Sequence, residues 1–313
     1  MAKILIIKLG ALGDVVMATS LIKQIQDYHH QDKIHLLTSD TFSHFFDNWE
    51  NLIVTAFPRK GFVATIKAVR WVRGNNFTRL YDLQSSDRTR LLTALSGTRE
   101  RVGNLPAYPY NLHPPDKYTG QKHIFLRMLD VLACAGINPA STPPVLPSSN
   151  KEKAKVARWL KDNNIEHKKF VIFHAGSSPK HMEKRWPYYK DLAKKLELSG
   201  FKIVLIGSKE DAETNRLLNM DTVIDTTGMF SIVETAELGK HAFFAVTNDS
   251  GPMHVLSCSE IPVYSFFGPT NWKRNHAIGQ EANVFSTKNN GPLDTILLET
   301  VIDRLLKDGL IKN

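Results

Sequence analysis

Short apolar segments alternate with amphipathic segments along the whole chain. The apolar segments, five or six residues long, are rich in Ile, Val, Leu and Phe, which is typical of strands buried on both faces of a sheet. We predict strands at 3–8, 34–38, 52–56, 80–84, 170–174, 202–206, 243–247 and 262–267. Helical spacing predicts helices at 14–28, 63–73, 88–95, 124–135, 188–198, 212–218, 232–238 and 253–257. This alternation predicts an α/β protein with parallel sheets covered on both faces.

A proline-rich segment separates two halves that share this pattern. Pro139, Pro143, Pro144 and Pro147 lie within thirteen residues, 138–150, and such a density interrupts helices and central strands. We predict a linker at 143–150 between a domain at 1–142 and a domain at 151–313, two doubly wound sheets facing each other across a cleft. The sequence does not decide whether the last helix, expected near 293–306, packs on its own domain or returns to the first.

The composition excludes several classes of protein. Hydrophobic residues make up 42% of the 313 residues, too many for a disordered chain. No apolar run approaches the ~18 residues that cross a bilayer, and the amino terminus becomes polar too early for a signal peptide. We interpret the two distant cysteines, Cys134 and Cys258, as buried apolar residues in a reducing compartment. These features predict a cytoplasmic protein.

The positive charge is concentrated in one part of the chain. The formal net charge is +9, and residues 59–101 hold ten Lys and Arg against three acidic residues, a net of +7. A basic block confined to one third of the chain predicts an anionic partner that meets one face. For any single residue of the block, an ordinary solvated helix surface remains the alternative.

The first polar motif is K-L-G-A-L-G-D, residues 8–14, where the first predicted strand turns into a helix. Its glycines permit a sharp turn close to a ligand, but the spacing fits neither the dinucleotide fingerprint nor the phosphate-binding loop. Asp14 would repel a phosphate at this helix start and suits a base that accepts a proton from a neutral hydroxyl. The alternative is a carboxylate that only stabilises the helix end.

Two further motifs follow predicted strands in the second half. H-A-G-S-S at 174–178 leads to K-R-W-P at 184–187, where small donors and a lysine suit a diphosphate. T-N-D-S-G-P-M-H at 247–254 places a polar turn before a short helix, with Gly251 and Pro252 exposing N–H groups toward an anion. Asp249 suits sugar hydroxyls better than phosphate. His254 could contact a phosphate or simply be a satisfied core residue.

Taken in this order, the three motifs resemble glycosyltransferase family 9, the ADP-heptose–lipopolysaccharide heptosyltransferases, over essentially the whole chain. The N-D-S-G-x-M-H form is closer to the second heptosyltransferase of the inner core than to the first. The resemblance implies the GT-B fold, two Rossmann-like domains with the active site between them. It also implies inverting transfer of a heptosyl group from ADP-heptose to the lipopolysaccharide inner core. Residues 179–183 depart from both inner-core forms, which leaves open a family member with another sugar donor.

The resemblance also implies roles for individual residues. Asp14 would be the general base that activates the acceptor hydroxyl. Glu210 would bind the ribose of the donor, and Met229 would pack against its base. The remaining donor contacts would be Lys184, Ser177 and Ser178 on the diphosphate, Ser250, Gly251 and His254 around the phosphates, and Asp249 on the sugar.

On this interpretation the basic block belongs to the acceptor, an anionic glycolipid. We expect acceptor contacts from Gly13, Arg59, Lys60, Lys67, Arg88 and Arg90. Lys and Arg near an anionic membrane contribute on the order of 1 kcal/mol each, so we expect a monomer peripheral to the cytoplasmic side of the inner membrane. The chain contains no D-x-D triplet, and we expect no obligatory metal or other cofactor.

Two other functions remain as alternatives. A sugar-nucleotide epimerase can share this two-domain fold, but it needs no acceptor and therefore no basic block. A nucleic-acid-binding protein would fit the pI of about 9.4. However, the block lacks interleaved aromatic residues of the single-strand type, and no helix-turn-helix or RNA-binding motif is evident. We therefore expect no nucleic-acid partner.

Overall fold

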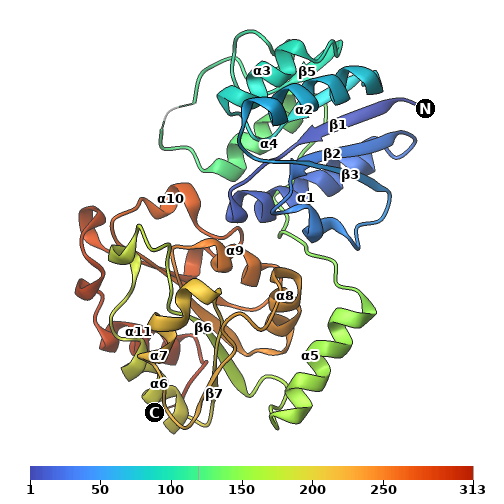
Figure 1. Cartoon of the computed structure of the whole chain (residues 1–313). Helices are drawn as coiled ribbons and strands as arrows, with labels where there is room; N and C mark the ends of the chain where they lie inside the picture. Colours follow the sequence, from blue (N-terminus) through green and yellow to red (C-terminus); the bar gives the residue numbers. More distant parts are fainter. Residues whose placement is uncertain (119, 313) are drawn as a thin grey trace. The chain divides into compact units, whose positions relative to one another are not determined.

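The chain folds into two compact units, Met1–Pro147 and Ser148–Asn313. The structure is a computed structural model that describes residues 1–118 and 120–312. In Figure 1 the first unit runs from blue to green and the second from green to red. Each unit holds one parallel sheet with helices packed on it, which confirms the predicted fold class.

The first unit is built on a five-stranded sheet in the order β3-β2-β1-β4-β5, and every neighbouring pair is parallel. Its strands are β1 (Lys3–Ile7), β2 (Lys33–Ser39), β3 (Leu52–Phe57), β4 (Arg79–Asp82) and β5 (Glu100–Val102). Strand order reverses at β1, which lies between β2 and β4. Ligands of such sheets bind beyond the carboxyl ends of the strands at this reversal, so the residues that follow β1 are the first place to look for a site.

In the described part of this unit, the sheet is accompanied by the helices α1 (Leu12–Tyr28), α2 (Phe62–Asn75), α3 (Asp87–Leu95) and α4 (Ile124–Cys134). The helices α1 and α4 pack on each other, and so do α2 and α3. Leu5 and Ile7 of β1 are fully buried in a cluster with Ala68 and Val72 of α2. Because alternate strand residues point to opposite faces, this cluster defines the face of the sheet that α2 covers.

The second unit is built on a six-stranded parallel sheet in the order β11-β10-β9-β6-β7-β8. Its strands are β6 (Phe170–His174), β7 (Lys202–Leu205), β8 (Val223–Asp225), β9 (Phe244–Asn248), β10 (Val263–Phe267) and β11 (Val284–Ser286). The order reverses between β6 and β9. The motifs 174–178 and 247–254 begin at the carboxyl ends of these two strands.

Helices cover both faces of the second sheet. On one face, Val171 and Phe173 of β6 pack with residues of α6 (Tyr189–Leu198) and α11 (Leu298–Lys307). On the other, Phe170 and Ile172 pack with α5 (Asn150–Asp162), α8 (Ile232–His241) and α9 (Gly251–Ser257). Two short helices, α7 (Ala212–Arg216) and α10 (Trp272–Asn275), complete the unit, as Figure 1 shows.

The structure corrects several sequence predictions. The helix α11 begins at Leu298 rather than near 293, because residues 293–295 form a separate 3-10 turn. It belongs to the second unit, where Val301 and Leu305 are fully buried. The helices α5 and α10 and the strands β5, β8 and β11 were not predicted. Both cysteines are unpaired but only partly buried, contrary to the expected burial. Over the described residues, no helix has the length and apolar character to span a membrane.

Candidate active site

The turn after β1 brings a lysine and a carboxylate together. Lys8 follows the last residue of β1, and Asp14 lies in the first turn of α1. Nζ of Lys8 is 3.6 Å from Oδ2 of Asp14 and donates to the carbonyl oxygen of Leu83 at 3.1 Å. The Lys8 side chain is 2% exposed and that of Asp14 is 29% exposed, so only the carboxylate is accessible to a ligand. Burial lowers the pKa of Lys8, and the neighbouring Asp14 and Asp82 partly oppose this shift.

A second carboxylate, Asp82, ends β4 in the same region and is fully buried. The Tyr110 hydroxyl donates to its Oδ2 at 2.5 Å, and the backbone N–H groups of Gln84 and Ser85 donate to Oδ1 at 3.0 and 2.8 Å. Burial nevertheless raises the pKa of Asp82. Its oxygens hold the turn at 82–85 in place, so of these two carboxylates only that of Asp14 is accessible.

Gly10 allows an arginine to lie against this turn. Oε1 of Gln84 accepts hydrogen bonds from the backbone N–H groups of Leu9 and Gly10, at 2.9 and 3.0 Å. Gly10 has a φ of +149°, which a residue with a side chain rarely adopts. A Cβ there would also lie 3.1 Å from Cζ of Arg59. The glycine therefore brings the Arg59 guanidinium against the turn that carries Asp14.

The predicted acceptor residues divide into two groups. Arg59 lies at the Gly10 turn, and Arg88 of α3 donates a hydrogen bond to the Arg59 carbonyl oxygen, while Gly13 lies half-buried in α1. Arg90 instead pairs with Asp87 of its own helix at 3.3 Å. The other two, Lys60 and Lys67, are exposed. The structure thus gathers part of the basic block near Asp14 and leaves the rest on the surface.

In the second unit, three loops at the carboxyl edge of the sheet meet at Asp249, which follows β9. Lys184, in the loop after β6, places its Nζ 2.6 Å from Oδ2 of Asp249. Thr270, in the loop after β10, donates its hydroxyl to the same oxygen at 2.6 Å. The side chains of Lys184 and Asp249 are 18% and 9% exposed. Two of the predicted donor residues therefore form an ion pair with each other.

Arg185 is a cation that sequence reasoning missed. Its Nε donates to Oγ of Ser177 at 3.0 Å, and Ser177 in turn donates to the carbonyl oxygen of His181 at 2.8 Å. Ser177 is buried, whereas Ser178 is exposed. The signal was present, since Arg185 directly follows the predicted Lys184 in the K-R-W-P segment.

Asn248, another residue that was not assigned a role, joins the predicted loops. Its Nδ2 donates to the carbonyl oxygens of Ala175 and Gly176 at 2.9 and 3.1 Å. Its Oδ1 accepts from the backbone N–H of Trp186 at 3.1 Å and from the Tyr189 hydroxyl at 3.3 Å. Because the side chain is fully buried with four hydrogen bonds, it fixes the H-A-G-S-S loop against the end of β9.

A buried histidine links the two motifs of the second unit. Nδ1 of His174 is 3.1 Å from Oγ of Ser250, and its Nε2 is 3.8 Å from Oδ2 of Asp211. Burial opposes ionisation of Asp211, but His174 and hydrogen bonds from Ser208 hold its pKa below the ordinary value. A Cβ at Gly176 would collide with the Asp211 carboxylate, so this approach requires a glycine there.

The remaining predicted donor residues lie on nearby segments. Gly251 begins α9, and His254 is buried one turn later. Glu210 and Met229 are both exposed. Their loops are adjacent, because the backbone N–H of Gly228 donates to the Gly207 carbonyl oxygen at 2.8 Å. Both side chains are therefore accessible on adjacent loops, and the ribose and base contacts that the resemblance implies for them stay predictions.

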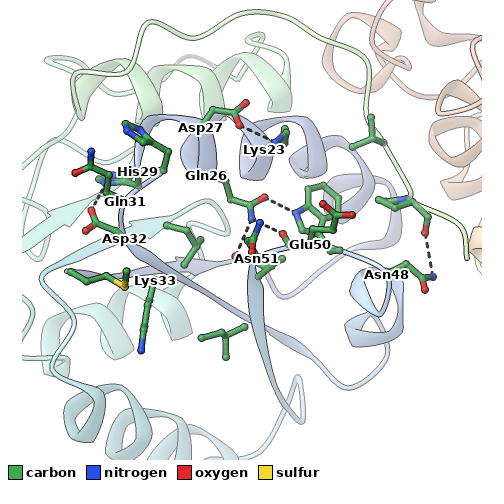
Figure 2. Close-up of a pocket in the computed structure, with 18 residues that line it drawn as sticks. Lys23, Gln26, Asp27, His29, Gln31, Asp32, Lys33, Asn48, Glu50 and Asn51 are labelled. Atoms are coloured by element: carbon green, nitrogen blue, oxygen red, sulfur yellow. Dashed lines mark hydrogen bonds and ion pairs between the residues drawn. The ribbon is translucent and has the colours of Figure 1, made fainter.

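A large cavity in the first unit, about 950 Å³, lies elsewhere (Figure 2). It is lined by residues at the amino ends of the strands, among them Met1, Lys33 and Leu52, whereas ligands of parallel sheets bind at the carboxyl ends. Polar side chains that line it form hydrogen bonds and ion pairs with one another. Trp49 Nε1 donates to Gln26 at 2.6 Å, and Lys23 pairs with Asp27 at 2.9 Å. No predicted site residue lines this cavity, so we do not assign it to the active site.

Comparison with known proteins identifies the family. The family described as "Glycosyltransferase family 9 (heptosyltransferase)" matches residues 65–296. Lipopolysaccharide heptosyltransferase 1 of Campylobacter coli is 24% identical over an alignment 316 positions long that covers 94% of this chain and 89% of that protein. The structure of a family 9 glycosyl transferase from Veillonella parvula has a TM-score of 0.80 at 19% identity, covering 100% of this chain and 90% of that one. The structure of E. coli ADP-heptose LPS heptosyltransferase II has a TM-score of 0.78 at 21% identity, with 97% and 98% covered.

The structural likenesses confirm the GT-B fold class, and the two motifs at 174–178 and 247–254 lie within the residues that the family matches. The match begins within α2 and ends before α11, so it includes β4 and β5 of the first sheet and all the strands named for the second. Because it covers more than half of the chain, this protein belongs to glycosyltransferase family 9, the heptosyltransferases, and is a glycosyltransferase enzyme.

Proposed function

We propose that this protein transfers a heptosyl group, with inversion, from ADP-heptose to the inner core of a lipopolysaccharide. The names of the similar proteins support the reaction, since they include a lipopolysaccharide heptosyltransferase and an ADP-heptose LPS heptosyltransferase. The observation that carries the proposal is the pairing of Asp14 with the buried Lys8 after β1. It presents one accessible carboxylate at the strand-order reversal of the first sheet.

Asp14 acts in this proposal as the general base. The acceptor hydroxyl attacks the anomeric carbon of the donor and its proton passes to Asp14, while the bond from that carbon to the diphosphate breaks and ADP leaves. Lys8 holds the carboxylate in position, because its own Nζ is also anchored on the Leu83 carbonyl oxygen. A base fixed before the substrate arrives does not have to be ordered during the reaction.

The second unit holds the donor. Lys184 exchanges its Asp249 partner for the diphosphate, and Asp249 is then available to accept hydrogen bonds from sugar hydroxyls. Arg185 beside Ser177 supplies a second cation. These groups, with Ser178, Ser250, Gly251 and His254, stabilise the charge that develops on the departing diphosphate. Glu210 binds the ribose, and the exposed Met229 packs on the base.

The acceptor contacts are proposed for the first unit. Arg59 and Arg88 lie together near the Gly10 turn and suit acid sugars or phosphates of an inner core. Lys60, Lys67, Arg90 and Gly13 complete the proposed set. We propose that the enzyme acts as a monomer, peripheral to the cytoplasmic side of the inner membrane.

The substitution Asp14→Asn tests the role of the base. It removes the proton acceptor but keeps the shape, so we expect transfer to slow by about 10²- to 10⁴-fold and ADP affinity, measured by calorimetry, to stay close to that of the unchanged protein. Asp27→Asn is the matched control on the same helix, because the exposed Asp27 only pairs with Lys23. If Asp14→Asn transferred heptose at the original rate, the base would lie elsewhere.

The donor requires a separate experiment. A comparison of ADP-heptose with other nucleotide sugars, followed by product analysis, is expected to give transfer from ADP-heptose only when the acceptor is present. Transfer from a different sugar nucleotide would contradict the proposed donor but not the family. Conversion of the sugar nucleotide without any acceptor would instead indicate an epimerase.

A further inference from the structure

The helix α2 carries positive charge without any compensating acid. Between Glu50 and Asp82 the chain has no Asp or Glu, while it has six Lys or Arg residues. Three of these, Lys67, Arg70 and Arg73, are exposed on α2. Their spacing of three residues places them as neighbours along the helix surface. The helix therefore presents a basic stripe to solvent.

The same helix begins with an apolar tip. Phe62 and Val63 are its first two residues, with 79% and 64% of their surfaces exposed. Within the described part of the chain, they are the only two consecutive large hydrophobic residues that are both exposed. The opposite side of α2 is well packed, since Ala64, Ala68 and Val72 are buried. Exposed apolar residues next to a charged rim are typical of an interaction site.

We propose that α2 docks the first unit on an anionic lipid bilayer. Phe62 and Val63 enter the boundary between headgroups and acyl chains, and Arg70 and Arg73 contact the lipid phosphates. A bilayer offers both an apolar layer and negatively charged headgroups. The aliphatic stems of lysine and arginine can lie along the apolar layer while their charged ends reach the headgroups. A nucleic-acid backbone or a soluble glycan would complement the stripe but leave the tip in water.

This inference rests on the membrane association included in the proposed function, and it names the surface responsible. The tip adjoins the proposed acceptor contacts in the chain, because Arg59 and Lys60 precede Phe62 by two or three residues. Arg59 itself lies against the Gly10 turn that leads to Asp14. Docking through α2 would thus hold the first unit near an acceptor that is anchored by its lipid, without changing the chemical step.

Vesicle sedimentation tests the proposal with the full chain. The protein is mixed with phosphatidylcholine vesicles with or without about one third phosphatidylglycerol, at low and high salt. We expect binding only to the anionic vesicles, and less of it at high salt. The double variant Arg70→Gln, Arg73→Gln should lower the partition constant by about 25-fold, because each lost charge lowers it roughly fivefold. Phe62→Ser with Val63→Ser should lower it on the order of tenfold.

The matched control carries the same kinds of change on α6 of the second unit. Leu198→Ser removes an apolar residue that is 85% exposed, and Lys190→Gln with Lys194→Gln removes two exposed charges. These variants should bind vesicles like the unchanged protein. The proposal is overturned if they lose as much binding as the α2 variants, or if the α2 variants bind normally. It also fails if the α2 arginine variants lose affinity for duplex DNA while keeping their affinity for vesicles.

Activity on a water-soluble acceptor without its lipid separates this inference from the proposed transfer. We expect the Phe62 and Val63 variants to keep kcat and KM on that acceptor and to lose activity only on acceptor embedded in vesicles. Equal losses on both acceptors would show that the tip acts in the active site and contradict docking. Failure of transfer by the unchanged protein would contradict the proposed function, whereas vesicle binding would still be measured independently.

Discussion

At the scale of single residues, His174 connects two loops of the second unit. Its ring lies between Ser250 and Asp211, which are otherwise on separate segments. A Cβ at Gly207 would lie 2.8 Å from Cβ of Asp211, so both Gly207 and Gly176 make room for this carboxylate. Ser250 precedes α9 and makes no side-chain cap to it, and its hydroxyl bonds to His174 instead. We interpret His174 as a positioning residue for Ser250.

Two substitutions separate the contacts of His174. The shorter asparagine side chain can put its amide where Nδ1 lies and keep the hydrogen bond to Ser250. The longer glutamine side chain puts its amide nearer the position of Nε2, toward Asp211, and loses the hydrogen bond to Ser250. We expect His174→Asn to keep ADP affinity within about threefold and His174→Gln to lower it about tenfold, the effect of one hydrogen bond. Calorimetry with ADP measures both.

A double-mutant cycle provides the control for His174. If His174 acts through Ser250, His174→Ala combined with Ser250→Ala should weaken ADP binding little more than either change alone. A merely structural role would instead make the two effects add. Equal losses for the asparagine and glutamine variants would likewise contradict a positioning role.

At the scale of elements, the sequence predicted those with a long apolar or amphipathic pattern and missed the others. The strands β5, β8 and β11 each have three residues and lie at the edges of their sheets. An edge strand is defined by its hydrogen bonds to one neighbour, and three residues are too few to show a period. The helix α5 was missed for another reason. Only Val156 and Leu160 are buried, and its start signal was overlooked.

That start signal is a capping box. The backbone N–H of Glu152 donates to Oγ of Ser149 at 3.3 Å, and the Glu152 carboxylate accepts from the Ser149 N–H at 2.7 Å. We expect Ser149→Ala to lower the free energy of unfolding by about 1 kcal/mol, measured by denaturant titration. Lys151→Ala, at an exposed position of the same turn, should change it by less than about 0.5 kcal/mol. A loss for the control equal to that for Ser149→Ala would show that the cap does not stabilise the helix.

At the scale of the whole molecule, the charged residues of the two units have different surroundings, and we propose different roles for them. The first unit carries the basic block, while the second provides Lys184 and Arg185 beside Asp249 and Ser177. Among the residues described, no group of three or more His, Cys, Asp or Glu is arranged to hold a metal ion. In the proposed reaction these two cations neutralise the leaving diphosphate.

Removal of divalent metal tests this assignment. Because Lys184 and Arg185 supply the charge, we expect a chelator to leave the transfer rate within about twofold, where a Lewis-acid metal would contribute several kcal/mol. Lys184→Ala should instead weaken both ADP-sugar binding and the rate. A rate that falls with chelator and recovers with added Mg²⁺ or Mn²⁺ would contradict the assignment.

The sequence by itself determined the alternation of buried strands and covering helices, the proline-rich segment between the two halves, and the motifs that resemble those of the family. These features are local, because they depend on neighbouring residues and the period of each element. Only the tertiary structure decided which side chains are paired. Lys184 meets Asp249 across 65 residues, and Lys8 is buried beside Asp14 and the Leu83 carbonyl oxygen. Such contacts follow from the order in which strands assemble, and that order brings together loops that no local pattern connects.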